Sequence, residues 1–335
     1  SERDYGHIRA ICSSMGFAFI ANYTECDRSL VHYLAAPIRG LGVFLIPICT
    51  AVTFFINIAI PSAAGCAAAV GSTLIPVMLR AGIKPAAAAA AVMGGTIGSY
   101  LSPGTSHNPF VAEMAGIDVM DFIAYHAFWS ILCGAIVVVG LLVVCMVLGD
   151  HKGEKVEAEV KKDDKPFKPN VLKAIMPLVP ITILVVGNVW LPVIKMGVAQ
   201  AMVLGAVITL LLSFAVDRTD PQEFSKRFFN GMGKGYADVM GIIIAAGVFA
   251  AGLRATGLID TFVDVLKHSN DIARWGGSLG PWIMGTITGS GDAATMAFNE
   301  AVTPHAPEFG MEIKSLGALA FLTGALGRTC LLYTS

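Results

Sequence analysis

Two long stretches of this sequence, residues 41–78 and 85–112, contain no Lys, Arg, Asp or Glu. A transmembrane helix needs about 20 consecutive apolar residues, whereas a helix buried in a soluble protein rarely has more than about 14. The whole chain is 55% hydrophobic and 14% charged, and an average soluble domain has about 25% charged residues. The sequence therefore predicts an all-α polytopic integral membrane protein.

The remaining composition excludes several other classes. The net charge is −1 and no basic stripe is present, so we expect no nucleic-acid partner. The seven cysteines are scattered and lack CxxC spacing, which indicates buried side chains rather than a metal or redox site. We expect no cofactor and no metal. The first residues include neither an initiator Met nor a signal peptide, so we expect the chain to begin inside a longer protein.

Hydropathy and charge divide the chain into regions. We expect transmembrane helices at 8–23, 122–148, 171–191, 202–216 and 239–253. The predicted regions are a first repeat (1–121), a transmembrane helix (122–149), a charged cytoplasmic linker (150–170), two scaffold helices (171–216), an interfacial amphipathic helix (217–235), a second repeat (236–330) and a tail that we interpret as non-native (331–335).

Helix-breaking residues interrupt the apolar runs of the first repeat twice. "NIAIPSAAGC" at 57–66 separates two apolar runs, and "SYLSPGTSHN" at 99–108 ends a Gly-rich one. Irregular backbone at membrane depth is tolerated only where protein or a water-filled cavity satisfies it. We therefore predict a re-entrant helical hairpin followed by a broken transmembrane helix, both directed towards a site.

The second half of the chain repeats this pattern. "IPSAAGCAAAVGSTLIP", ending at Pro76, aligns with "TGSGDAATMAFNEAVTP", ending at Pro304, at an offset of 228 residues. The same offset, or one residue more, relates Gly82 to Gly310, Gly95 to Gly324 and Gly98 to Gly327. Internal repeats with unwound helices at matching positions are typical of secondary transporters.

The two repeats are predicted to have opposite orientations in the membrane. Between the start of the first repeat and the start of the second, the chain crosses the membrane an odd number of times, whether the hairpin contributes zero crossings or two. The loop at 150–173 carries seven lysines and should be cytoplasmic by the positive-inside rule. Arg80 and Lys84 then lie inside, and their repeat equivalents Glu308 and Glu312 lie outside, so the sign of the charge changes with the side of the membrane.

The hairpin tips and helix breaks supply the candidate binding residues. Helix N-termini carry free N–H groups and a partial positive charge, which suit an anion. The candidate substrate-binding residues are Ser62, Ser102, Thr105, Ser106, Asn108, Gly289, Ser290, Gly291, Arg328 and Thr329. Each polar member could instead be a helix cap, but as a group they indicate a site. No catalytic residue is expected.

Three ionisable residues occur in these breaks. A carboxylate at membrane depth is costly and usually functional, so we expect Asp292, with Thr295, to bind a coupling Na⁺ or H⁺, or Asp292 to pair with Arg328. The guanidinium of Arg328 has the geometry to hold a carboxylate, although a snorkelling interfacial arginine is the alternative. His107 could titrate near neutral pH, but we interpret it as a polar loop histidine.

Several segments resemble a known family. "YADVMGIIIAAGVFAAGL" at 236–253, "TGSGDAATMAF" at 288–298 and "LGRT" at 326–329 resemble the DcuC type of anaerobic C4-dicarboxylate transporters, within the ion transporter superfamily. "PVMLRAGIKPAAAAA" and "EMAGIDVMDF" in the first half are similar too. Members are longer at both ends, so we expect this chain to be truncated. Members often have Asn at the position of Asp292.

The resemblance implies a secondary carrier of succinate, fumarate and malate in the bacterial inner membrane. It implies cation-coupled symport or antiport with elevator-like alternating access, in a homodimer surrounded by lipid. It also implies that substrate and cation bind at the tip around Ser62, the tip at 289–292 and the break at 328–329.

Other functions are less compatible with the sequence. A carrier of another organic anion or of an amino acid, in the same superfamily, remains open. Gly-x-Gly-Asp also occurs in intramembrane aspartyl proteases, but these need a second aspartate at matching depth, after a Tyr, and a Pro-Ala-Leu motif. Neither Tyr-Asp nor Pro-Ala-Leu occurs here. A channel would need a continuous polar pore, whereas these polar residues cluster at one depth. We therefore expect a carrier and not an enzyme.

Overall fold

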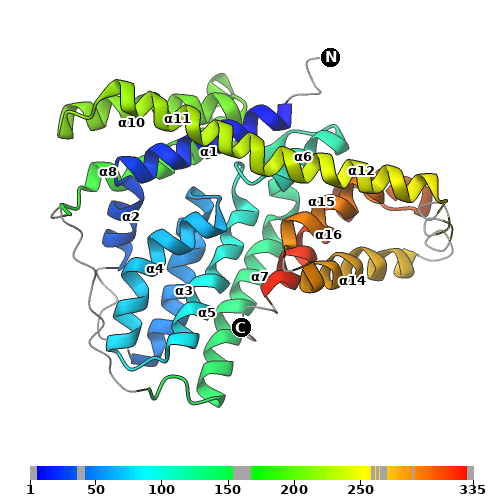
Figure 1. Ribbon diagram of the computed structural model, residues 1–335, viewed down its shortest axis with the longest axis horizontal. Coiled ribbons are helices and arrows are strands. Elements are labelled where there is room, and N and C mark those ends of the chain that lie inside the picture. Colours follow the sequence, from blue (N-terminus) through cyan, green and yellow to red (C-terminus); the bar gives the residue numbers. More distant parts are fainter. Residues whose placement is uncertain are drawn as a thin grey trace. The chain divides into compact units, whose positions relative to one another are not determined.

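The computed structural model describes residues 6–35, 42–153, 167–257, 261, 264, 270–288 and 290–329. All regular secondary structure within these ranges is helical, as predicted (Figure 1). Five segments among them are long and apolar enough to cross a membrane: Gly42–Ala59, Ala63–Arg80, Val119–Val147, Val198–Asp217 and Pro221–Leu253. The chain is therefore an all-α polytopic membrane protein. The tail predicted at 331–335 lies outside the described residues.

The chain forms two compact units. Unit 1 comprises residues 1–11, 106–126 and 234–335, and unit 2 comprises residues 12–105 and 127–233. The units do not follow the predicted repeat boundaries, because residues 106–121 of the first repeat group with helices of the second. The repeats thus describe the order of the helices along the chain, whereas the units describe which helices pack together. The inverted orientation of the repeats stays a prediction.

The first predicted hairpin is present in unit 2. Helix α3 (Leu45–Ala59) and helix α4 (Ala63–Arg80) are separated by a short break that contains Pro61. Proline disfavours the helical conformation of the residue before it, and Ile60 accordingly has φ −115° and ψ 89°. The break predicted from the sequence is confirmed.

The helix after this hairpin is interrupted, also as predicted. Helix α5 (Pro85–Gly95) continues into a 3₁₀ segment, Thr96–Leu101, and the next helix, α6 (His107–Ala115), begins only after five further residues. Pro103 lies in this break and cannot donate a backbone hydrogen bond. Helices α3, α4 and α5 pack together through buried apolar side chains, among them Leu45, Ile56, Val70, Leu74, Ala87 and Ala91.

Unit 2 also contains other helices, in whole or in part. They are α1 (Gly6–Tyr23), α2 (Cys26–Ala35), most of α7 (Val119–Val147), α8 (Val171–Ile175), α9 (Val179–Val189), α10 (Val198–Asp217) and α11 (Pro221–Gly235). The span predicted at 171–191 is helical but not uniform, because a 3₁₀ turn, Met176–Leu178, separates α8 from α9. Pro177 and Pro180 account for this turn, since each lacks the N–H that a helix interior uses.

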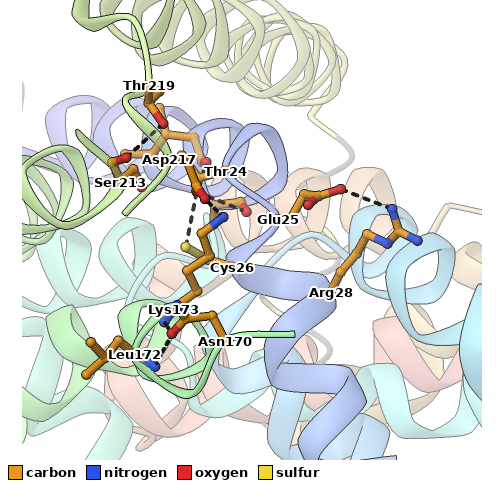
Figure 2. Close-up of polar contacts among 12 residues, drawn as sticks. Thr24, Glu25, Cys26, Arg28, Asn170, Leu172, Lys173, Ser213, Asp217 and Thr219 are labelled. Carbon is orange, nitrogen blue, oxygen red and sulfur yellow. Dashed lines mark hydrogen bonds and ion pairs between the residues drawn. The ribbon is translucent and has the colours of Figure 1, made fainter. Parts of the chain in front are cut away.

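An ion pair joins α8 to the end of α10 (Figure 2). The ammonium group of Lys173 contacts the Asp217 carboxylate, and the Lys173 side chain is only 7% exposed. Asn170 caps α8 by accepting a hydrogen bond from the N–H of Leu172 at 2.8 Å. Nearby, the Thr24 hydroxyl lies 3.1 Å from the sulfur of buried Cys26, at the start of α2.

Unit 1 contains the second hairpin. It is formed by α14 (Asn270–Thr288) and α15 (Gly291–Ala301), and α16 (Ile313–Thr329) packs along α14 after a 3₁₀ segment, Thr303–Phe309 (Figure 1). One apolar cluster joins α15 to α16, and a second joins both to α6, to the start of α7 and to α12 (Gly241–Ala255). The second cluster includes Phe110, Val111, Phe122, Ala246, Met296 and Ala318.

Helix α12 continues α11 without a loop. A π-helical segment, Tyr236–Met240, connects the two, so that the backbone is helical from Pro221 to Ala255 (Figure 1). The boundary predicted at 236 between an interfacial helix and a repeat therefore lies inside one helix. Whether residues 217–235 lie at the membrane surface stays a prediction.

Equivalent glycines allow the same close helix contact in both repeats. A Cβ atom on Gly98 would overlap the backbone carbonyl of Phe54 in α3, and a Cβ on Gly327 would overlap that of Trp282 in α14. Phe54 and Trp282 are 228 residues apart, and the two glycines are 229 apart. The offset read from the sequence thus recurs in the packing of each hairpin against the helix that follows it.

Candidate functional site

The first hairpin tip presents a capped helix N-terminus. Ser62 is the N-cap of α4, and its hydroxyl oxygen accepts a hydrogen bond from the N–H of Gly65 at 3.1 Å. Serine is a favoured N-cap because it satisfies one of the N–H groups that a helix start leaves open. No acidic residue lies in the first turn of α4. The tip therefore offers N–H groups and a positive dipole end to an anion.

The second tip has the same construction. Ser290 is the N-cap of α15 and accepts a hydrogen bond from the N–H of Ala293 at 3.2 Å. Gly291 follows, and a Cβ on it would lie 2.8 Å from the backbone carbonyl oxygen of Gly324. Gly291 is therefore required for contact with α16, rather than for ligand access alone. Gly289, also a candidate, lies outside the described residues.

In unit 2, the break after α5 lies against the first tip. Asn57 is fully buried, and its Oδ1 accepts a hydrogen bond from the N–H of Ser99 at 2.5 Å, while its amide donates to the Ile60 carbonyl at 2.9 Å. A Cβ on Gly104 would lie 3.1 Å from the Pro61 ring. The tip and the break therefore form one polar region.

Two predicted residues belong to this break. Ser102 is buried, and its hydroxyl oxygen is 3.4 Å from the N–H of Gly104. The Thr105 hydroxyl donates to the Ser99 carbonyl at 2.6 Å. Both side chains hold the irregular backbone in place. The structure therefore shows a capping role for each of them.

The other two predicted residues of this stretch lie in unit 1, at the start of α6. Ser106 is the N-cap position of α6 but makes no side-chain capping bond. Asn108 is fully buried, and its Oδ1 lies 3.2 Å from Nε2 of His126 in α7. Since Oδ1 only accepts, this nitrogen of His126 carries the hydrogen.

Asp292 has an ionisable partner that the sequence did not predict. Its Oδ1 lies 3.0 Å from Nε2 of His107, the first residue of α6. The His107 side chain is 1% exposed, and that of Asp292 is 52% exposed. The imidazole also stacks on the Phe321 ring, at 4.5 Å between centroids. The interpretation of His107 as a polar loop histidine is wrong, because α6 begins at this residue and buries it.

The remaining candidates lie on α15 and α16. Thr295 is fully buried, and its hydroxyl donates to the Ala320 carbonyl at 3.4 Å. The Thr295 hydroxyl also lies so close to Gly324 that a Cβ atom on this glycine would overlap it. Arg328 and Thr329 end α16, and their side chains lie outside the described part of the structure. The predicted pairing of Asp292 with Arg328 stays a prediction. Across the described residues, no group of three or more His, Cys, Asp or Glu side chains could hold a metal ion.

Three residues at these sites were missed or misread from the sequence. Asn57 and His126 each lie inside an otherwise apolar run, and polar residues within transmembrane segments are usually functional or paired. That signal was available for both. His107 could not be assigned, because its partner is 185 positions away.

Comparison with known proteins agrees with this architecture. The chain matches the family described as DcuC, C4-dicarboxylate anaerobic carrier, over residues 10–326. A Haemophilus influenzae protein named as an uncharacterized transporter is 44% identical over 243 residues, covering 68% of this chain and 85% of that protein. A second H. influenzae protein with that name is 69% identical over 83 residues, covering 25% of this chain and 57% of that protein.

A more distant relative is aligned over most of this chain. The anaerobic C4-dicarboxylate transporter DcuC of Escherichia coli K12 is 24% identical over 323 residues, which cover 94% of this chain and 69% of that protein. The family match extends from α1 to α16 and includes both hairpins and the helix break after α5. This chain therefore belongs to the DcuC family of C4-dicarboxylate anaerobic carriers.

Proposed function

We propose that this chain is a secondary carrier of C4-dicarboxylates such as succinate, fumarate and malate. The observation that carries the proposal is the pair of equivalent tips, where Ser62 and Ser290 each cap a helix N-terminus. A helix N-terminus with free N–H groups suits a carboxylate group, and each repeat supplies one such N-terminus. As a member of this family with several helices that can span a membrane, the chain lies in the bacterial inner membrane.

Neutral polar groups support this assignment. The break after α5 adds Ser102 and Thr105 beside the first tip, and α6 adds Ser106 and Asn108 in unit 1. Neutral donors bind a carboxylate without holding it as tightly as a buried charge would, and a carrier must also release its substrate. In this proposal Arg328 and Thr329 complete the site, with the guanidinium holding one carboxylate.

Transport is proposed to be driven by a cation, Na⁺ or H⁺, bound at Asp292 with Thr295. The carrier would exchange or co-transport the two solutes through an elevator-like movement of one part of the protein, within a homodimer in the bilayer. The second candidate substrate class is another organic anion or an amino acid. The intramembrane protease alternative is wrong, because the family and the relatives are transporters.

Uptake by proteoliposomes tests the substrate class. Labelled succinate should accumulate, and unlabelled fumarate and malate should compete for it, whereas a tricarboxylate and a basic amino acid should not. Competition by an amino acid but by no dicarboxylate would favour the second candidate class. A protein that folds and competes with no dicarboxylate would contradict the proposal.

A conservative substitution tests the proposed role of Arg328. Arg328→Lys keeps the charge but removes the two-pronged hydrogen bonding of the guanidinium, so we expect transport to be lost. Arg80→Lys, on the solvent-facing end of α4, is the matched control, since Arg80 is exposed and bonds only to the Pro76 carbonyl among the described contacts. Near-normal affinity in Arg328→Lys would remove this residue from the site.

A further inference from the structure

We propose that His107 and Asp292 form a proton-binding pair that couples this carrier to a proton gradient. The inference rests on the proposed function, and it identifies the coupling ion as H⁺ rather than Na⁺. The pair joins the first residue of α6 to the first turn of α15, with 3.0 Å between Nε2 and Oδ1. Proton binding therefore occurs where α6 contacts the second hairpin, both in unit 1.

The position of the imidazole hydrogen follows from burial. The other ring nitrogen of His107, Nδ1, is buried and has no hydrogen-bond partner among the described residues. An N–H group at that position would be a buried donor without an acceptor, which costs about 1–3 kcal/mol. The hydrogen of the neutral ring is therefore on Nε2, which donates it to Asp292. In this state the pair consists of a neutral imidazole and a carboxylate, with a net charge of −1.

Exposure gives the route of the proton. The Asp292 side chain is 52% exposed, whereas that of His107 is 1% exposed. In this proposal a proton therefore binds at the more accessible carboxylate end, and the net charge of the pair changes from −1 to 0. The bond to the proton is the only covalent bond that forms. Release of the proton on the other side of the membrane breaks this bond and restores the net charge of −1. Because the two groups are joined by a hydrogen bond, the proton belongs to the pair and not to either residue alone.

Other ionisable groups lie on the helices that pack with α6. The ring centroid of His126 in α7 lies 6.3 Å from that of Phe321, and its Nε2 is bonded to Asn108. Four more groups lie about 7–12 Å along their helices from His107, His126, Asp292 or Phe321, at the helical rise of 1.5 Å per residue. They are Glu113 of α6, Asp121 of α7, Glu300 of α15 and Lys314 of α16. Arg328, whose side chain is not described, is the remaining charged residue of α16.

The same geometry is unsuited to Na⁺. Hard cations prefer a cage of oxygen ligands, but one carboxylate oxygen of Asp292 accepts an N–H whose hydrogen points at it. The second predicted cation ligand, Thr295, is fully buried and donates to the Ala320 carbonyl. A proton needs no such cage. It also removes the negative charge that would repel a dianionic substrate from this tip.

The number of protons bound with the substrate tests the proposal on the wild-type protein alone. Calorimetric titration of the purified carrier with succinate, in buffers of different ionisation enthalpy, measures proton uptake on binding. An isolated carboxyl titrates near pH 4, and the second carboxyl of a dicarboxylate titrates higher because of the first charge. At about pH 7.5–8.5 the substrate is therefore a dianion and does not contribute. We expect about one proton per succinate, and an apparent Kd that rises by up to tenfold per pH unit.

Two conservative substitutions then assign the proton to this pair. His107→Gln keeps a donor for the carboxylate but cannot titrate, and Asp292→Asn imitates the neutral pair. Both should bind succinate without proton uptake, and Asp292→Asn should keep the low-pH affinity of the wild type at every pH. His305→Gln is the matched control, because His305 pairs with Glu308 at 2.7 Å outside the site. Its pH dependence should equal that of the wild type.

The outcomes distinguish this inference from the proposed function. Succinate binding that depends on Na⁺ and takes up no proton would overturn the inference and leave the carrier assignment standing. Undiminished proton uptake in folded Asp292→Asn would also overturn it. Failure of every C4-dicarboxylate to bind would instead contradict the function on which it rests.

Discussion

Ser62 and Ser290 occupy equivalent places in two hairpins that are 228 residues apart. Each is the N-cap of the second helix of its hairpin, and each accepts a hydrogen bond from the N–H three residues later, at 3.1 and 3.2 Å. The structural equivalence therefore extends from helix order to individual hydrogen bonds. Each tip offers a helix N-terminus of the kind that suits an anionic group.

Removing either cap should weaken both stability and substrate binding. Ser62→Ala and Ser290→Ala each remove one N-cap bond, which is worth about 1 kcal/mol, and we expect a lower Tm in detergent and a higher Kd for succinate. Ser72→Ala and Ser278→Ala are the controls, because these hydroxyls bond within their own helices. A change of Kd as large in the controls as in the cap variants would contradict the prediction.

Glycine substitutions should have opposite effects at different sites. Gly98→Ala and Gly327→Ala would force a Cβ into a facing backbone carbonyl, so we expect a loss of at least about 1–3 kcal/mol through overpacking. Gly252→Ala, on exposed α12, meets no atom within 4 Å, and should stabilise the helix by about 0.5–1 kcal/mol. Thermal unfolding followed by intrinsic fluorescence measures all three. Equal tolerance of alanine at Gly98 and Gly252 would show that the close crossing is absent.

Removing Lys173 and removing Asp217 from their ion pair should reduce stability by different amounts. Asp217→Asn leaves the ammonium of Lys173, whose side chain is 7% exposed, without its carboxylate partner, and we expect a loss below the cost of breaking a fully buried pair, which is about 3–5 kcal/mol. Lys173→Met leaves a carboxylate that is 44% exposed and still solvated, so the loss should be smaller. Lys226→Met, which breaks an exposed pair with Glu223, should change stability by less than about 1 kcal/mol. Equal losses in the first two variants would contradict the asymmetry.

Asp27 should make stability depend on pH in the acidic range. Burial raises the pKa of this carboxyl above its usual value of 3.8, and hydrogen bonds from Asn22 and from the N–H of Arg28 offset only part of that effect. Because the folded state favours the neutral acid, Asp27 stabilises the folded protein fully below about pH 3.8. This stabilisation is lost as the pH rises through the folded-state pKa of Asp27.

Asp27→Asn should therefore flatten this part of the pH profile. We expect the wild type to lose stability relative to the variant as the pH is raised from about 3.5, and the difference to stay constant once the carboxyl is fully ionised. Asp220→Asn, at an exposed cap that accepts the N–H of Gln222 at 2.9 Å, is the control. Parallel profiles for the wild type and Asp27→Asn would refute the assignment.

The sequence was most informative where backbone chemistry is local. Pro61 and Ser62 placed the first break, and the repeat offset then located the second. Gly82 and Gly310, aligned by the same offset, both have positive φ, at 86° and 75°. Such features depend on a few neighbouring residues, so they could be predicted without knowledge of the tertiary structure.

Contacts between distant segments could not be predicted in this way. Asp292 was identified as costly, but nothing local indicated that α6 would bring His107 to it across 185 positions. The close approach of Gly291 to α16 was likewise interpreted as ligand access, because a glycine at a tip suits both purposes. Apolar periodicity also gave no sign that α11 and α12 are one helix, since the intervening polar residues resemble a surface segment.

The uninterrupted helix from Pro221 to Ala255 has a mechanical consequence. The chain passes from unit 2 to unit 1 between Gly233 and Lys234, within α11, and the π-helical segment Tyr236–Met240 follows directly. No loop is available there to act as a hinge. Any displacement of one unit against the other must therefore bend a helix over one or two turns. Glycines and the π-helical segment make this part of the helix the easiest to bend.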